Sequence, residues 1–289
     1  MNRIINAIEE WVKDLLVPLI EANLINMFFD INDKVGTIAT EVGHTPHSWN
    51  VNIFNMIRNL SETVILPIAG IIITYVLCVE LISMVMDKNS FHDNVDTFMF
   101  FKFFFKAWVA VFLVAHTFDI TMAIFDVAHW VVTRSRGVIS GGTNINLIGG
   151  AVNDMNLRDY SVGELLGLLI DTMIVSIGMK IMSIIITVII YGRMIKIYLT
   201  CSVAPIPFAT MTNREWGQIG NNYLKGLFAL GFQGFLIIVC VAIYAVLLSG
   251  MIVNTDVNDA IWSLTAYTVL LCFALIGSGR LANSVFNAH

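Results

Sequence analysis

The chain has 289 residues, of which 57% are hydrophobic and only 13% are charged. Soluble domains contain about 25% charged residues on average, so this composition excludes an ordinary soluble globular domain. The mean hydropathy of +0.79 agrees with that conclusion. The net charge of −5 does not define a partner, because the basic residues are unevenly placed along the chain.

The N-terminal segment, residues 4–29, carries apolar residues near a 3.6-residue rhythm. This pattern predicts an amphipathic helix, bent at Pro18 because proline removes one intrahelical hydrogen bond. Helices that lie on lipid are usually rich in Lys and Arg, whereas this segment is net acidic. We therefore expect it to pack on its own bundle or on a neighbouring subunit. Residues 1–63 form the first predicted domain, which consists of this helix and an extracytoplasmic segment.

Five apolar stretches predict transmembrane helices, since a helix of ~20 apolar residues crosses a bilayer. The longest stretch without any Asp, Glu, Lys or Arg includes residues 227–253. The sequence thus predicts an all-α, polytopic membrane helix bundle over residues 64–289. The five predicted spans are residues 64–86, 98–132, 165–192, 227–253 and 260–278.

The second predicted span, residues 98–132, is too long for a straight crossing. As one helix it would measure ~52 Å, against a hydrocarbon core of ~30 Å. Two arrangements fit: the helix tilts steeply, or it leaves the membrane near Asp119 and continues as an amphipathic helix. The number of spans also stays open, because a six-span alternative uses residues 199–212 and reverses the C-terminus.

The distribution of Lys and Arg predicts the orientation. With five spans, residues 87–97, 193–226 and the C-terminus lie on one side of the membrane, and this side carries the denser basic charge. Cytoplasmic flanks are enriched in Lys and Arg. The bias favours an extracytoplasmic N-terminus and a cytoplasmic C-terminus.

Several charged residues fall inside the predicted spans. A charge at mid-bilayer costs at least ~2.5 kcal/mol on insertion scales, so it usually faces a partner or water. Lys180, Lys102 and Lys106 are candidate partners for Glu80. Two interpretations stay open: a buried ion pair that fixes the register of the helices, or a hydrated path for ions or a polar polymer. The candidate pathway residues are Glu80, Lys102, Lys106, Asp171 and Lys180.

The most distinctive segment is residues 193–226, which the charge bias places in the cytoplasm. Pro205 and Pro207 predict a helix break, because each lacks an N–H and clashes with the preceding turn. The apolar run around them is too short to cross a bilayer. It is therefore expected to be a broken or re-entrant segment, or an elbow at the membrane surface.

Known catalytic signatures such as HExxH, GxSxG and Walker A do not occur in this sequence. We therefore predict a protein that is not an enzyme and that uses no cofactor.

The four cysteines form no CxxC pair, which argues against a disulfide framework or a zinc site. His116, Asp119, Asp126 and His129 lie broadly on one side of the second span, but a polar helix face explains them without a metal.

A layout and a loose motif carry a family resemblance. The third span ends in basic residues, and the Ala204-Pro205 break follows it. The step from Asn213 to Trp216 then leads into a span with Gly231, Gln233 and Gly234. This arrangement, over roughly residues 64–289, resembles the VirB/TrbL-like family of polytopic membrane subunits from type IV secretion and conjugation systems.

The resemblance implies a channel or scaffold subunit of a conjugative machine in the bacterial cytoplasmic membrane. Such a subunit helps single-stranded DNA and protein to cross that membrane. The implied partners are membrane lipid, further copies of the same chain, other subunits of the machine, and, transiently, single-stranded DNA and a relaxase-type protein.

Bases near the cytoplasmic side fit this role, because attraction to phosphate is the sequence-independent term in DNA binding, and aromatic rings provide stacking surfaces. The positive-inside bias of any membrane protein explains the same bases. The predicted basic and aromatic face consists of Lys88, Arg193, Lys196, Tyr198, Arg214, Trp216, Tyr223 and Lys225.

Small and polar residues at helical spacing predict contacts between subunits, although packing within one subunit explains them equally well. These residues are Gly163, Gly167, Gly231, Gln233 and Gly234.

An alternative function also stays open, namely a secondary transporter or ion channel for a small solute. Glu80, Lys180 and the proline-broken segment resemble the discontinuous helices of transporters, but the two halves of the chain show no repeat.

Overall fold

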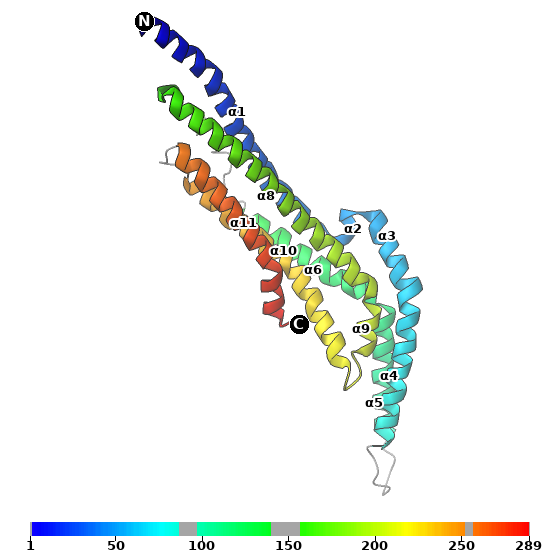
Figure 1. Ribbon diagram of the computed structural model, residues 1–289. Helices are drawn as coiled ribbons and strands as arrows, with labels where there is room; N and C mark the ends of the chain where they lie inside the picture. Colours follow the sequence, from blue (N-terminus) through cyan, green and yellow to red (C-terminus); the bar gives the residue numbers. More distant parts are fainter. Residues whose placement is uncertain (1, 87–96, 140–156, 252–256, 289) are drawn as a thin grey trace. The chain divides into compact units, whose positions relative to one another are not determined.

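A computed structural model describes residues 2–86, 97–139, 157–251 and 257–288 (Figure 1). Within these residues the regular structure is helical throughout. The longer helices are α1 (Asn2–Val42), α3 (Val51–Leu60), α4 (Leu66–Met86), α5 (Thr97–Ala115), α6 (Thr117–Ile139), α8 (Val162–Val203), α10 (Gly217–Met251) and α11 (Val257–Phe286). The shorter elements are α2 (Pro46–Trp49), the π-helix η1 (Ser61–Ile65), the 3-10 helix η3 (Leu157–Asp159) and α9 (Pro205–Thr210).

Four helices in the described residues are long and apolar enough to cross a membrane, and α5 with α6 adds a fifth if the pair is one bent span. The predicted all-α polytopic bundle is confirmed, and the chain is a multi-pass membrane protein. The first of these helices begins at Val51, well before the predicted start at residue 64. The four helices are Val51–Met86, Val162–Val203, Gly217–Ser249 and Asn258–Phe286.

The second predicted span is bent. Helices α5 and α6 meet at His116 with an angle of 69° between them. The break lies three residues before Asp119, the point at which one of the two predicted arrangements has the helix leave the membrane. A bend solves the length problem, because neither half is as long as the ~52 Å of one straight helix.

The chain forms two compact units that interleave along the sequence. Unit 1 comprises Met1–Gly43, Val132–Tyr191 and Leu236–Ser278, and unit 2 comprises His44–Val131, Gly192–Phe235 and Gly279–His289. The long helices α6, α8, α10 and α11 each contribute a segment to both units.

In unit 1, α1 lies beside α8 (Figure 1). The Lys13 ammonium donates to the carbonyl oxygen of Arg158 at 3.0 Å, and the Arg158 guanidinium pairs with Asp14 at 2.8 Å. Leu16 and Ile20 are buried in this unit. Pro18 lies inside α1, which continues past the predicted end at residue 29 as far as Val42.

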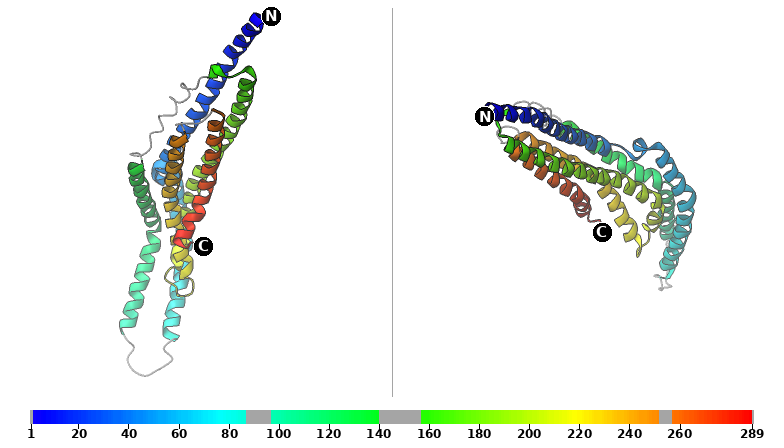
Figure 2. Two further views of the ribbon diagram at one scale, coloured as in Figure 1. Left: turned by 90° about the vertical axis from the view of Figure 1, so that its left-hand side faces the viewer. Right: turned by 45° about the horizontal axis from the view of Figure 1, so that its top comes forward.

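Unit 2 has its core where α3, α4, α6, α8 and α10 meet around Phe54, Ile73, Ile197 and Leu227. Helices α4 and α5 contact each other over part of their length and separate towards one end (Figure 2, left), and the short helix α9 packs against both. Helix α9 begins at Pro205, directly after α8 ends at Val203. The helix is thus interrupted at Ala204, beside the predicted break residue Pro205, whereas Pro207 lies inside α9.

Candidate functional site

Unit 2 contains a cleft with charged walls, which we call the basic cleft. Its volume is ≈ 420 Å³. The described residues that line it include three cationic side chains and one carboxylate, which gives this lining a formal excess of positive charge. The lining residues are Glu80, Ser83 and Met84 from α4, Lys102, Phe103 and Lys106 from α5, and Arg214 from the turn after α9.

An ion pair spans the cleft. The Nζ atom of Lys106 lies 2.5 Å from Oε1 of Glu80, and the two side chains are 35% and 18% exposed. Of the three lysines that the sequence offered as partners for Glu80, Lys106 makes the contact. The pair compensates two charges that would be costly alone at membrane depth. Lys102 and Arg214 contribute the remaining positive charge of the cleft.

Local features of the sequence determine where the basic side chains of the cleft lie. Lys102 and Lys106 are four residues apart, so they project from one face of α5. Arg214 belongs to the turn that follows α9. There the side-chain oxygen of Asn213 accepts hydrogen bonds from the backbone N–H groups of Glu215 at 2.7 Å and Trp216 at 2.9 Å. Such an Asx-type bond holds a turn in one conformation.

Two close contacts hold that turn against unit 2. The rings of Trp216 and Tyr75 stack with centroids 5.8 Å apart and an interplanar angle of 21°. Gly220 touches the preceding segment so closely that an added Cβ would collide with the Met211 side chain and would lie 2.5 Å from the carbonyl oxygen of Pro207. The first turn of α10 therefore packs directly against α9 and Met211. Because Arg214 belongs to the turn between the two helices, this contact restricts its position.

Comparison with known families decides the identity of the chain. A protein-family model described as TrbL/VirB6 plasmid conjugal transfer like protein matches residues 31–205, which is more than half of the sequence. The chain belongs to this family. The resemblance to VirB/TrbL-like proteins is thus confirmed, and membership implies a component of the conjugal transfer machinery. No curated protein and no solved structure matches the chain.

The matched range differs from the one that the sequence predicted. It begins in α1, before residue 64, and it ends at Pro205. For this TrbL/VirB6-like protein, the match therefore includes Glu80, Lys102 and Lys106 of the basic cleft. Arg214 lies beyond it, as do the glycines of α10 on which the resemblance also rested.

Three residues of the predicted basic and aromatic face lie inside unit 2. The Arg193 guanidinium is 7% exposed and donates to the carbonyl oxygens of Leu230 and Gly231, each at 3.4 Å. The Tyr198 hydroxyl donates to the carbonyl of Pro46 at 2.5 Å, and the Tyr223 hydroxyl donates to the carbonyl of Thr200. In this conformation the three side chains link separate segments of unit 2 by hydrogen bonds. They do not form the continuous exposed face that the sequence predicted.

The other residues of the predicted face are placed differently. Lys196, Arg214 and Trp216 are exposed, and Lys225 is half-buried. Lys88 lies outside the described residues. Arg214 alone of this set lines the basic cleft, so the predicted face is divided between several environments.

Two predicted pathway residues, Asp171 and Lys180, belong to unit 1 and do not line the basic cleft. Asp171 is half-buried and Lys180 is exposed. A role for them in a path stays a prediction.

The predicted oligomer contacts fall into two groups. A Cβ on Gly231 would lie 2.9 Å from the Cβ of Ala128, so this glycine lets α10 approach α6 within the chain. Gln233 lies against Gly279 of α11, and Gly234 is buried. Packing within one subunit accounts for these three. Gly163 and Gly167 are exposed with open space at the Cβ position, so their role between subunits stays a prediction.

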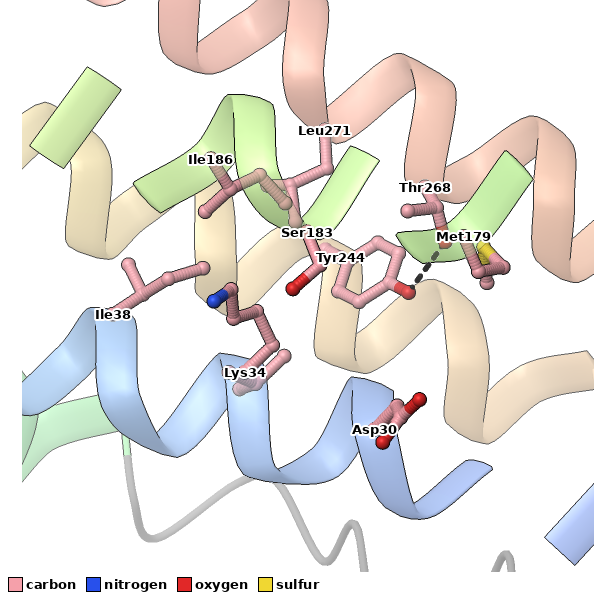
Figure 3. A pocket seen from close by; sticks show the side chains of 10 residues that line it. Asp30, Lys34, Ile38, Met179, Ser183, Ile186, Tyr244, Thr268 and Leu271 are labelled. Carbon is pink, nitrogen blue, oxygen red and sulfur yellow. Dashed lines mark hydrogen bonds between the residues drawn. The ribbon is translucent and has the colours of Figure 1, made fainter. Parts of the chain in front are cut away.

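Sequence reasoning missed a polar cavity in unit 1 (Figure 3). The Lys34 ammonium donates to the Thr187 hydroxyl at 2.7 Å, and the hydroxyls of Tyr244 and Thr268 share a hydrogen bond of 2.9 Å. The cavity that these helices enclose has a volume of ≈ 20 Å³, about one water molecule. Lys34 lies one helical turn after Asp30, which was the available signal, but no helix was predicted there.

A second missed cluster lies beside the bend between α5 and α6. The Arg58 guanidinium pairs with Glu62 at 2.8 Å and with Asp119 at 3.5 Å, and it lies 5.7 Å from the ring of Phe118. The spacing of Arg58 and Glu62 in the sequence is a signal for such a pair. His116 lies 3.9 Å from Asp119. In the described parts of the chain, no group of three or more His, Cys, Asp or Glu side chains is arranged to hold a metal ion.

Proposed function

We propose that this protein is a non-enzymatic channel or scaffold subunit of a conjugative type IV secretion machine, and that its basic cleft contacts the phosphates of single-stranded DNA during transfer. Family membership supports a place in the conjugal transfer machinery. The observation that carries the DNA contact is the cleft itself, where Lys102, Lys106 and Arg214 face one carboxylate.

The chemistry of the cleft suits a phosphate backbone. Attraction between Lys or Arg and phosphate does not depend on base sequence, as a machine that carries any plasmid strand requires. The cleft volume of ≈ 420 Å³ lies within the range of ~300–1,000 Å³ that small-molecule sites occupy, so one nucleotide fits. An arriving phosphate competes with Glu80 for Lys106.

One residue of an aromatic pair is close in sequence to Arg214 of the basic cleft. Trp216 is two residues from Arg214 and stacks on Tyr75, and the two side chains are 41% and 56% exposed. Stacking on aromatic rings tolerates every base because each base has a π-face. The Trp216–Tyr75 pair is therefore proposed as a stacking surface for the bases of the strand.

The proposed setting is the bacterial cytoplasmic membrane, with the N-terminus outside and the C-terminus in the cytoplasm, as the distribution of Lys and Arg favours. The proposed partners are lipid, further copies of the chain, other subunits of the machine and a relaxase-type protein. The exposed Gly163 and Gly167 on α8 provide a small-residue face of the kind that membrane helices use to associate.

The alternative, a transporter or ion channel for a small solute, gains no support from the polar cavity of unit 1. That cavity has room for about one water molecule. The proline-broken segment, which favoured the alternative in the sequence, packs its short helix α9 against α4 and α5, so packing within the chain supports the first proposal equally well.

A mating assay tests the proposal. The gene is deleted and complemented with the wild type, with the double variant Lys102→Gln/Arg214→Gln, or with Arg134→Gln. Arg134 is an exposed base of α6 in unit 1 and serves as the matched control. Because each charge-assisted hydrogen bond contributes ~1.5–3 kcal/mol, the double variant should lower transfer at least about tenfold, at unchanged protein level in the membrane.

Normal transfer by the double variant, or an equal loss in Arg134→Gln, contradicts the role of the basic cleft. Normal transfer after deletion of the gene contradicts the role in conjugation itself.

A further inference from the structure

A second cavity of unit 2 shares no residue with the basic cleft. It lies where the end of α8, the start of α10 and the end of α11 come together, and its volume is ≈ 500 Å³. We call it the Lys196 groove. The residues that carry the argument are Lys196 from α8, Pro207 from α9, Ile219, Asn222 and Leu230 from α10, and Asn283 from α11.

The groove combines donors with apolar walls. Lys196 contributes an ammonium, and Asn222 and Asn283 contribute carboxamides, all of which donate hydrogen bonds to an anionic oxygen. No carboxylate is among the described residues that line it. Ile219 is 57% exposed on the headgroup side of Asn222, and Leu230 lines the groove on the membrane side, within the uncharged stretch of α10. An anion bound here therefore has apolar side chains beside it.

The position of the groove along the helices indicates its depth in the membrane. On α11 the residues 260–279 carry no charge and Arg280 follows them. A helix of that length spans ~30 Å, the thickness of the hydrocarbon core. On α10 the uncharged stretch begins just after Lys225. Asn283 lies beyond Arg280, and Asn222 lies on the charged side of Lys225. The groove is therefore at the depth of the lipid headgroups.

We propose that the Lys196 groove binds an anionic glycerophospholipid, with Lys196, Asn222 and Asn283 at the headgroup phosphate and with Leu230 on the side of the acyl chains. Basic pockets between transmembrane helices at headgroup depth bind anionic lipids by this chemistry. The apolar wall and the depth favour a lipid over free phosphate or a nucleic acid. The proposal does not depend on DNA contact at the basic cleft.

Lipid binding to the purified full-length protein tests the proposal. The detergent-solubilised protein is incubated with equal concentrations of phosphatidylglycerol and phosphatidylcholine, and bound lipid is counted by native mass spectrometry. The wild type should retain several times more phosphatidylglycerol than phosphatidylcholine. Because one Lys near the membrane surface contributes ~1 kcal/mol to binding of anionic lipid, Lys196→Gln should lower retention about fivefold.

Two further variants make the result specific. Lys196→Arg keeps the charge and should retain phosphatidylglycerol like the wild type. Lys180→Gln removes an exposed lysine from the same helix α8 but outside the groove, and it should also retain the lipid. Circular dichroism of each variant confirms that the helices are intact.

Three outcomes overturn the proposal. The first is equal retention of the two lipids by the wild type. The second is a loss in Lys180→Gln that equals the loss in Lys196→Gln, since charge alone would then explain binding. The third is displacement of phosphatidylglycerol by millimolar inorganic phosphate or by a single-stranded oligonucleotide, which assigns the groove to a free anion or to nucleic acid. Retention of the lipid in the presence of both competitors supports it.

Discussion

Lys106 on α5 and Glu80 on α4 form an ion pair of 2.5 Å at the wall of a cleft that also contains Lys102 and Arg214. The pair links the two neighbouring helices and leaves the cleft with an excess of positive charge. The Lys106–Glu80 ion pair therefore bears both on the stability of the protein and on the proposed contact with DNA. Mutations can separate the effect on stability from the effect on transfer.

The first prediction concerns stability. Lys106→Met should lower the free energy of unfolding by about 1–3 kcal/mol, because it leaves the partly buried carboxylate of Glu80 without its cation. The double variant Lys106→Met/Glu80→Gln should recover most of this loss. Thermal unfolding of the detergent-solubilised variants measures the coupling in a double-mutant cycle. Strictly additive effects of the two substitutions would show that the pair contributes nothing.

The second prediction concerns the close approach of α10 to α9. Gly220→Ala should destabilise the protein by about 1–3 kcal/mol, because the new methyl group collides with Met211. Gly226→Ala is the matched control on the same helix, where an added Cβ meets nothing within 4 Å. This control should be neutral or slightly stabilising, since Ala is the better helix former. Similar melting temperatures for the two variants would refute the tight contact.

The third prediction concerns the turn that presents Arg214. Asn213→Ala removes the acceptor of two backbone hydrogen bonds and should cost about 1–2 kcal/mol of stability. It should also reduce conjugal transfer, because Arg214 loses its fixed position. Asn213→Asp keeps a side-chain oxygen and should remain close to the wild type in both measurements. If Asn213→Asp is as defective as Asn213→Ala, the turn does not depend on this acceptor.

The fourth prediction concerns the polar cavity of unit 1. Tyr244→Phe removes the hydroxyl that bonds to Thr268 and should cost about 0.6 kcal/mol, a typical value for hydrogen bonds between membrane helices. Tyr267→Phe, on α11, is the comparison. Melting curves of the two variants decide the prediction, and no difference between them would contradict it.

Much of the fold was predictable because the rules involved are local. Runs of apolar residues longer than a bilayer crossing predicted the spans, and the missing N–H groups of Pro205 and Pro207 predicted the end of α8. The excess length of residues 98–132 predicted either a steep tilt or a change of course near Asp119, and the structure has a bend at His116. None of these inferences requires knowledge of which helices are neighbours.

The errors arose where a distant neighbour decides the outcome. The sequence placed Arg193 at a surface because it ends an apolar stretch, whereas the carbonyls of Leu230 and Gly231 on α10 accept its hydrogen bonds inside unit 2. Similarly, Asp30 and Lys34 interrupted the apolar rhythm of the N-terminal segment and hid the second half of α1. Thr187 on α8 supplies the polar contact that keeps Lys34 in that helix.

In the candidate site, too, local rules identified the residues, whereas distant contacts determine how they are arranged. Glu80, Lys102 and Lys106 were singled out from the sequence because a charge inside an apolar span needs a partner, and Arg214 was singled out as part of the basic and aromatic face. Their convergence was not predictable, since Arg214 is far along the chain from Glu80 and Lys102. The packing of α9 against α4 and α5 brings the turn that follows it, and with it Arg214, to these helices.

The most direct test of DNA contact at the basic cleft is photo-crosslinking during transfer. A photo-crosslinking amino acid replaces Phe103, which lines the cleft, or Arg134, which does not. Cells are irradiated while mating, and the protein is isolated and probed for the transferred strand. We predict a crosslink to this strand from position 103 and none from position 134. Continued transfer with no crosslink from position 103, or equal crosslinks from both positions, would contradict the proposed function.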